Sequence, residues 1–161
     1  VKQILLTNPD KIPYFYQLTQ AGFDNKAPTS VVKDGIEILR EYRSMSNDVI
    51  TSTSLGSEIE VHIQLRSLEN PYLSNIVIVD LLPGGFEVVS DSVETIGLEY
   101  TDVREDRVIF FTSLSTEAKE IVYRIKATNK GTFVVPAISA ESMYNPKIKA
   151  RGMAGQMTVT D

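Results

Sequence analysis

The 161-residue chain contains no cysteine, no tryptophan and a single histidine, His62. The absence of cysteine excludes disulfides, thiolate chemistry and metal sites built on cysteine ligands. His62 has neither a second imidazole nor a thiol with which to share a metal, so we interpret it as a surface histidine. No serine nucleophile elbow and no phosphate-binding loop occurs either. We therefore predict no catalytic residue, no cofactor and no bound metal.

Positive charge is also scarce, since 16 Lys and Arg face 21 Asp and Glu and give a net charge of −5. A nucleic-acid surface needs clustered cations, so we expect no nucleic-acid partner. The longest apolar runs, such as Ile76–Val79, fall far short of the roughly 20 residues that a membrane helix needs. We therefore expect no membrane insertion by this chain. Because the chain starts at Val1 and not at methionine, we expect it to be a piece of a longer protein.

The most informative segment is Ile76–Val88, in which a β-branched run stops at Pro83-Gly84-Gly85 and a second strand begins at Phe86. Proline sets the first position of a turn, and glycine accepts the positive φ that follows. The segment therefore predicts two strands joined by a hairpin or by a corner.

Strand patterns fill most of the remaining chain. Glu58–Arg66 alternates apolar and polar residues, as a strand with one buried face does. Further strands are predicted at Gly35–Arg43, Arg107–Leu114, Glu120–Thr128, Thr132–Val135, Ile138–Met143 and Gln156–Thr160. Turn signals separate them about every ten residues, and at most one helical turn is expected, at Ser115–Ala118. The fold class predicted is all-β, an immunoglobulin-like antiparallel β-sandwich.

The beginning of the chain has a different character. Lys2–Thr7 and Tyr14–Thr19 predict two strands joined through Asn8-Pro9-Asp10. The polar stretch Asn25–Asp34 then predicts a linker or a crossing loop before the main pattern of strands.

Acidic residues crowd one loop between predicted strands. Its members are Glu99, Asp102, Glu105 and Asp106, with Arg104 and Arg107 interleaved. A calcium loop needs a regular spacing of oxygen ligands and a glycine at its sharp turn, and that pattern is absent. We expect these charges to pair with one another.

Two further charged features have alternative interpretations. Asp80 interrupts an apolar run, and it should either accept hydrogen bonds from turn amides or face a cation such as Arg66 or Arg124. The basic run Lys147–Arg151 lies beside Tyr144, and it is either a contact patch or a solvated strand edge.

Several sequence segments, taken in order along the chain, resemble the C-terminal module of bacterial alpha-2-macroglobulins, which are broad-spectrum protease traps. The segments are Tyr14-Phe-Tyr-Gln-Leu with Gly22-Phe23, Ile38-Leu-Arg-Glu-Tyr, the turn at Gly56, Val79-Asp-Leu-Leu-Pro-Gly-Gly-Phe-Glu, Asp102-Val-Arg-Glu-Asp-Arg-Val, Tyr123-Arg-Ile-Lys-Ala, and Gly131-Thr-Phe through Ala140-Glu-Ser-Met-Tyr-Asn-Pro. The resemblance spans nearly the whole chain. Its departures are mild, with Gly84 where alanine is common and Glu105 where aspartate is common.

The resemblance implies a macroglobulin-type sandwich at residues 25–161, with residues 1–24 belonging to a preceding β-domain. The parent would be a multidomain protein of the periplasm or cell surface, in some cases a lipoprotein, that traps a protease after bait cleavage. The thioester that many members carry cannot lie in this chain, because it requires cysteine. This module would instead be non-catalytic, with the thioester domain and, through the parent, target proteases as partners.

The resemblance also implies that the terminal sandwich packs on the thioester domain and shields the reactive bond from water. We predict that Met143 and Tyr144 contribute to that contact, because they are bulky residues placed just before an Asn-Pro turn. The alternative is that both side chains belong to the core or to a strand edge.

A second hypothesis comes from another class of protein. Asp80–Phe86 also resembles a corner found in repeated spacer modules of bacterial surface proteins. Against this, the chain contains no internal repeat. A carbohydrate-binding module would lack its usual exposed tryptophan platform, and an autonomous enzyme has the least support.

Overall fold

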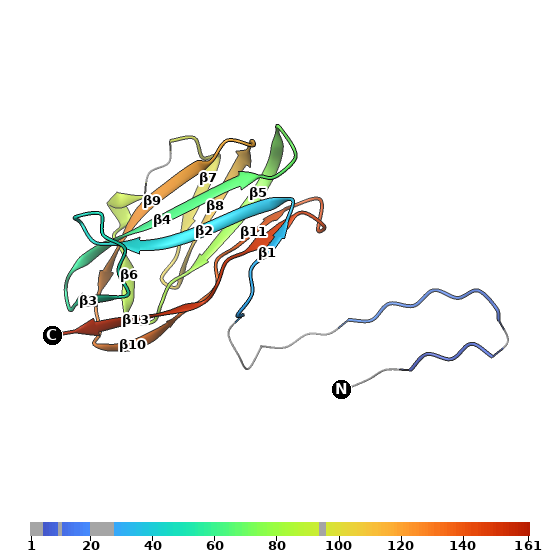
Figure 1. The fold of residues 1–161 in the computed structure, drawn as a ribbon, viewed down its shortest axis with the longest axis horizontal. Helices are drawn as coiled ribbons and strands as arrows, with labels where there is room; N and C mark the ends of the chain where they lie inside the picture. The colour runs from blue at the N-terminus through green and yellow to red at the C-terminus, as the bar shows by residue number, and fades with distance from the viewer. Residues whose placement is uncertain (1–4, 10, 20–27, 94–95) are drawn as a thin grey trace.

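The computed structural model describes residues 5–9, 11–19, 28–93 and 96–161. Thirteen strands in these residues form three sheets (Figure 1). The strands of the two larger sheets alternate buried and solvent-facing side chains, so the apolar faces pack together as a β-sandwich. The predicted all-β class is confirmed.

The six-stranded sheet forms one layer of the sandwich. In spatial order its strands are β1 (Val32–Asp34), β12 (Lys149–Arg151), β11 (Ser139–Ser142), β5 (Leu73–Leu81), β8 (Arg107–Leu114) and β7 (Tyr100–Val103). All neighbouring pairs are antiparallel.

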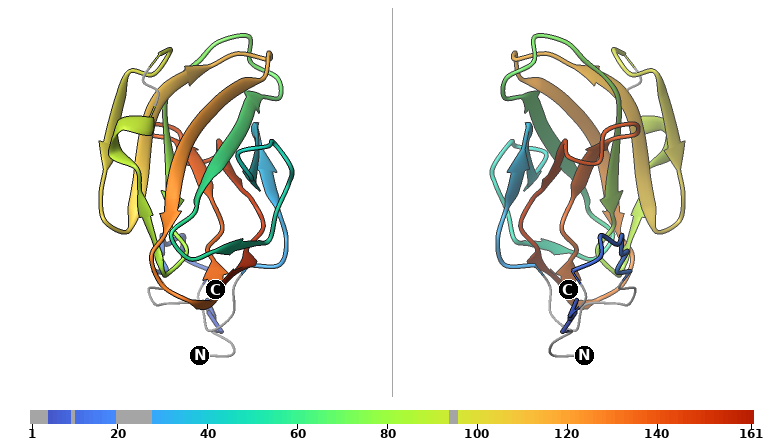
Figure 2. Two further views of the ribbon diagram at one scale, coloured as in Figure 1. Left: turned by 90° about the vertical axis from the view of Figure 1, so that its left-hand side faces the viewer. Right: turned by 90° about the vertical axis from the view of Figure 1, so that its right-hand side faces the viewer.

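A four-stranded sheet forms the opposite layer, and a three-stranded sheet completes the fold (Figure 2). The four-stranded sheet has the order β2 (Ile36–Arg43), β4 (Glu58–Ser67), β9 (Lys119–Ala127) and β6 (Phe86–Val88). The three-stranded sheet has the order β10 (Gly131–Val135), β13 (Gly155–Thr160) and β3 (Ser52–Ser54), with β13 and β3 parallel. One 3-10 turn, η1, covers Ser90–Ser92.

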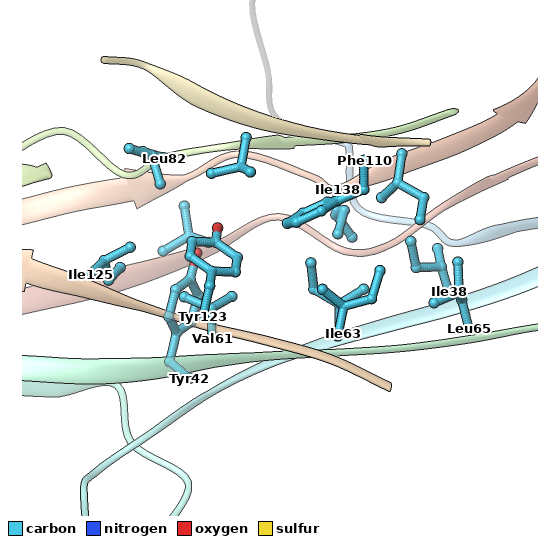
Figure 3. Close-up of a cluster of buried hydrophobic side chains, with 14 of the residues drawn as sticks. Ile38, Tyr42, Val61, Ile63, Leu65, Leu82, Phe110, Tyr123, Ile125 and Ile138 are labelled. Carbon is cyan, nitrogen blue, oxygen red and sulfur yellow. The ribbon is translucent and has the colours of Figure 1, made fainter. Parts of the chain in front are cut away.

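The core fills the space between the two larger sheets (Figure 3). The alternation predicted for β4 is confirmed, because its four apolar side chains, Ile59, Val61, Ile63 and Leu65, are at most 2% exposed. Phe110 of β8 packs on Tyr123 of β9 with ring centroids 5.9 Å apart, so aromatic contacts join the layers.

The Pro83-Gly84-Gly85 segment is a corner between sheets and not a hairpin. The strand before it, β5, belongs to the six-stranded sheet, and β6 after it belongs to the four-stranded sheet. Gly85 has a φ of +78°, and a Cβ atom there would lie 2.5 Å from Cζ of Phe133. The position therefore requires glycine both for its backbone conformation and for the close approach of the Phe133 ring.

Some sequence predictions are wrong at the periphery. Residues 5–7 and 14–19 form no strand, because no strand of the described residues pairs with them. Lys2–Ile4 of the first predicted strand lie outside the described residues. Ser115–Ala118 is a bend without helix. The short strands β1, β3, β7 and β12 were not predicted, and β1 falls within the expected linker.

No helix in the described part of the chain has the length and apolar character needed to cross a membrane.

Candidate interaction site

Asp80 forms a buried ion pair that joins the two layers. Its Oδ1 accepts a hydrogen bond from Nη1 of Arg40, on the inward face of β2 in the opposite sheet. The Asp80 and Arg40 side chains are 1% and 3% exposed. The expected partners Arg66 and Arg124 are wrong, since both pair with glutamates of the four-stranded sheet. Side chains, and not turn amides, satisfy the Asp80 carboxylate.

Oδ2 of Asp80 and Nη2 of Arg40 also form hydrogen bonds. Tyr123 donates its hydroxyl to Oδ2 of Asp80 at 2.8 Å, and Nη2 of Arg40 donates to the carbonyl of Pro136 at 2.5 Å. The guanidinium carbon of Arg40 lies 5.2 Å from the ring centroid of Tyr42. Burial raises the pKa of Asp80, and Arg40 and Tyr123 limit that rise. The pair is almost fully enclosed and joins the two sheets.

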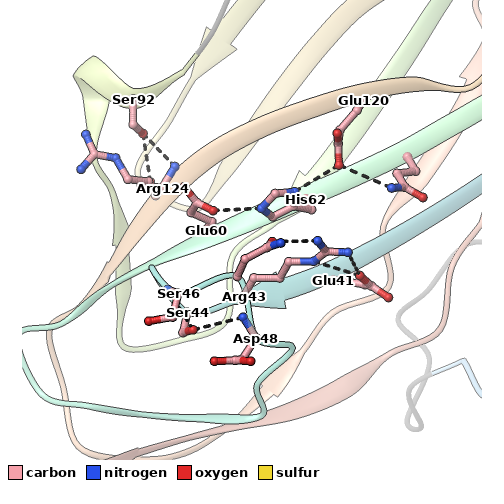
Figure 4. Close-up of polar contacts among 12 residues, drawn as sticks. Glu41, Arg43, Ser44, Ser46, Asp48, Glu60, His62, Ser92, Glu120 and Arg124 are labelled. Carbon is pink, nitrogen blue, oxygen red and sulfur yellow. Dashed lines mark hydrogen bonds and ion pairs between the residues drawn. The ribbon is translucent and has the colours of Figure 1, made fainter.

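His62 lies on the outer face of the four-stranded sheet between two carboxylates (Figure 4). Its Nε2 is 3.0 Å from Glu60 and its Nδ1 is 3.1 Å from Glu120. Both contacts are hydrogen bonds only when both ring nitrogens carry protons. The hydrogen bond from His62 lowers the pKa of Glu120. Glu41, which lies opposite His62 in the register, pairs with Arg43 on the same outer face.

The predicted pairing in the acidic loop holds for Asp102 and Asp106, whereas Glu99 and Glu105 form no ion pair with the described residues. Arg104 Nη2 lies 2.7 Å from Asp102, and Arg107 Nη2 lies 2.5 Å from Asp106. In the described residues no three His, Asp or Glu side chains gather closely enough to hold a metal ion.

The basic run does not form a strand edge. Lys149 and Arg151 belong to β12, which lies between β1 and β11 inside the six-stranded sheet, and Lys147 precedes it in a turn. The alternative of a solvated strand edge is therefore wrong. Both strand residues face outward, since Ala150 between them is buried.

Met143 and Tyr144 follow β11 and are exposed, at 51% and 79%. The amide of Met143 donates to the carbonyl of Asn75 at 2.9 Å, which ties this segment to the beginning of β5. The amide of Ile148 donates to the carbonyl of Asn145 at 2.9 Å and closes the Asn-Pro turn. The two side chains are therefore not core residues, and they are presented on a segment whose backbone is fixed at both ends.

Two further exposed apolar side chains lie at the same end of the six-stranded sheet. Tyr72 immediately precedes β5 and is 70% exposed, and Leu68 lies in the same loop. Sequence reasoning missed both. A signal was present for Tyr72, because it follows an Asn-Pro pair just as Tyr144 precedes one. The structure thus separates three sets of sequence candidates: Asp80 in the core, His62 on the outer face of one sheet, and Met143 with Tyr144 at the end of the other.

The comparisons with known proteins agree with this fold. Residues 35–147 match the family described as the bacterial alpha-2-macroglobulin MG10 domain. The chain belongs to the bacterial alpha-2-macroglobulin family. It is 36% identical to the alpha-2-macroglobulin homolog of Yersinia pestis over 92% of its length, and 39% identical to the alpha-2-macroglobulin of Rickettsia conorii over 91%.

Solved alpha-2-macroglobulins share the fold of this chain. The trypsin-activated Escherichia coli protein superposes with a TM-score of 0.76 at 21% identity over 87% of this chain and 11% of that one. The Salmonella protein reacted with methylamine gives 0.75 at 22% identity over 87% of this chain and 10% of that one. The chain spans 9% of the Yersinia relative and 8% of the Rickettsia relative, so it is similar to one module of much longer alpha-2-macroglobulins.

Proposed function

We propose that this chain is the non-catalytic C-terminal module of a protease-trapping alpha-2-macroglobulin and that it packs on the thioester domain. In this proposal Met143 and Tyr144 cover the thioester and exclude water from it. A thioester exposed to water hydrolyses, so the covering surface must be dry and bulky. The observation that carries the proposal is the fixed turn on which Tyr144 is 79% exposed, because an aromatic ring held out from the sandwich leaves most of its apolar surface free for a partner.

What is known of the relatives supports this assignment. The Escherichia coli relative is activated by trypsin, a protease, and the Salmonella relative reacts with methylamine. A small amine is a nucleophile of the kind that opens a thioester. Family membership favours the trap over the alternative of a spacer module from a surface protein. We place the parent in the periplasm or at the cell surface, held there as a lipoprotein, where it defends the cell against foreign proteases.

The segment before the sandwich fits a neighbouring domain. Residues 1–24 are proposed to belong to a preceding β-domain. Within residues 5–9 and 11–19, seven apolar side chains are exposed: Leu5, Leu6, Ile12, Tyr14, Phe15, Tyr16 and Leu18. A run of this kind needs a partner surface, because an exposed apolar segment is otherwise prone to aggregation.

The test of the shielding role uses the full-length parent. Tyr144→Ala should raise the rate of spontaneous thiol release, measured with a thiol reagent, by about tenfold, which corresponds to about 1.4 kcal/mol of lost protection. Tyr144→Phe keeps the ring and should behave like the unmodified protein. Met45→Ala, at a residue of similar exposure to Met143 but on another surface, is the matched control. Equal release from the Ala and Phe variants would show that the ring covers nothing.

A further inference from the structure

The middle of the six-stranded sheet is apolar on both faces. In β5, Ile76 and Ile78 face the core at 0% exposure, while Val77 and Val79, which alternate with them, face outward and are half-buried. In β8 the same arrangement places Ile109 and Phe111 outward, next to buried Val108 and Phe110. A strand with one face in water alternates apolar and polar residues, whereas a strand covered on both faces is a continuous apolar run.

These four outward side chains form one contiguous surface. Val77 lies opposite Phe111 in the register, and Val79 lies opposite Ile109. Phe111 also lies opposite Tyr100 of β7, with the ring centroids 5.8 Å apart. None of them belongs to the core cluster or packs against it. We call this surface, Val77, Val79, Tyr100, Ile109 and Phe111, the outer apolar face.

The opposite layer shows what a water-facing surface of this fold looks like. The outer face of the four-stranded sheet carries ion pairs along its length, including Arg43 with Glu41, Arg66 with Glu37 and Arg124 with Glu58 (Figure 4 shows part of it). The two outer faces of one sandwich therefore differ in kind. The charged face is suited to solvent, and the outer apolar face is suited to contact with protein.

Charged residues border the outer apolar face, with Arg151 in the row of Val79 and Glu141 and Lys149 in the row of Val77. Ser139 lies opposite both Arg151 and Val79, so these three residues form one row across the sheet, with Arg151 at the end of the row beyond Ser139. Neither Lys149 nor Arg151 forms an ion pair with the described residues of the chain. The Nε atom of Arg151 is buried and has no hydrogen-bond partner among those residues. A buried donor without an acceptor is costly, so an acceptor from another surface would relieve it.

We propose that another domain of the same longer chain docks on the outer apolar face, with its apolar centre over Val77 and Phe111 and a carboxylate facing Arg151. The related proteins extend far beyond this module, which spans 9% of the Yersinia relative, so the same polypeptide supplies many candidate surfaces. Met143 follows directly after β11, the strand that lies beside β5 in this sheet. The docking surface is thus continuous with the Met143–Tyr144 contact, and it extends the proposed function, on which the choice of occupant rests.

Hydroxyl-radical footprinting of the intact full-length parent tests this inference. Tyr100 and Tyr144, at 63% and 79% exposure in this chain, should both be oxidised about tenfold more slowly than free tyrosine, a protection that corresponds to about 1.4 kcal/mol. Met45 and Met153, of similar exposure but on other surfaces, serve as internal references and should oxidise as exposed methionines. Protection of Tyr144 without Tyr100 would overturn this inference and leave the proposed function standing. Protection of Tyr100 without Tyr144 would overturn the proposed function and leave this inference standing.

Two variants of the parent make the same test by perturbation. Val79→Lys should raise the oxidation of Tyr100 about tenfold by opening the docked face, and Leu39→Lys, on the outer face of the other sheet, should not change it. Val79→Thr, which nearly keeps the shape of valine, should give an intermediate increase even if the lysine variant fails to fold. Tyr100 protection that is lost on tenfold dilution would identify a second copy as the occupant and would overturn the assignment to the same chain.

Discussion

Breaking the buried ion pair between Arg40 and Asp80 by removing one partner should strongly destabilise the sandwich. Asp80→Asn keeps the shape of the side chain but removes its charge, and the guanidinium of Arg40 remains cationic inside the protein. Removing one partner of a buried pair typically costs about 3–5 kcal/mol, because an uncompensated charge stays in a low-dielectric site. The Arg40 and Asp80 side chains are almost fully enclosed, at 3% and 1% exposure, so we expect Asp80→Asn to lower the free energy of unfolding by an amount within this range.

Urea unfolding of the 161-residue chain measures this cost directly. With a slope of about 2 kcal/mol per molar urea, a loss of about 3–5 kcal/mol lowers the midpoint by about 1.5–2.5 M. Such a loss is a large share of the roughly 5–15 kcal/mol that usually holds a domain folded. Circular dichroism and tyrosine fluorescence should report the same transition if unfolding is two-state.

Two controls separate the buried pair from ion pairs in general. Asp102→Asn removes the carboxylate of a solvent-accessible pair with Arg104, and it should cost no more than about 1 kcal/mol. The double variant Arg40→Met with Asp80→Asn removes both charges and should recover most of the stability lost in the single variant. If Asp80→Asn cost no more than Asp102→Asn, the reasoning from burial would be refuted.

Two other predictions concern the corner and the buried phenols. Gly85→Ala should destabilise the chain by about 2–4 kcal/mol in the same urea assay, because it combines a positive φ with a clash against Phe133. Gly56 has a similar φ but open space around it, so Gly56→Ala should cost only about 1–2 kcal/mol. Equal costs for the two variants would show that the Phe133 ring moves aside without a loss of stability. Burial raises the pKa of both Tyr42 and Tyr123, so the folded state keeps protons that the unfolded chain releases above about pH 10. The stability that these phenols contribute is fully present below that pH and is lost above it, by about 1.4 kcal/mol per pH unit for each phenol. Tyr42→Phe should therefore halve the loss between pH 10 and 11, and an unchanged slope would contradict the assignment.

The sequence was sufficient where a strand carries its own signal. The strict alternation of Glu58–Arg66 predicts which side chains of β4 are buried, and the structure confirms it. The short strands β3 and β12 have no such signal, because three residues cannot show a period and their pairing is supplied by neighbouring strands. Tyr14–Thr19 fails for the opposite reason, since it has the composition of a strand but no partner beside it.

The buried partner of Asp80 could not be identified from local pattern alone. Arg40 continues the inward period of Ile36 and Ile38, but a cation in that register is favourable only when an anion lies opposite. That anion is 40 residues away in the other sheet. The exposure of Met143 and Tyr144 also depends on the turn that follows them, which the Asn-Pro pair indicates and the hydrogen bonds of the structure define.

In the proposed function, this module works through contact with the rest of its parent, and Tyr144 lies at that contact. The most direct measurement is the oxidation rate of Tyr144 in the intact parent. Our account predicts a rate about tenfold below that of free tyrosine, although the side chain is 79% exposed in this chain, a difference that corresponds to about 1.4 kcal/mol of protection. Oxidation of Tyr144 at the rate of free tyrosine would contradict the account.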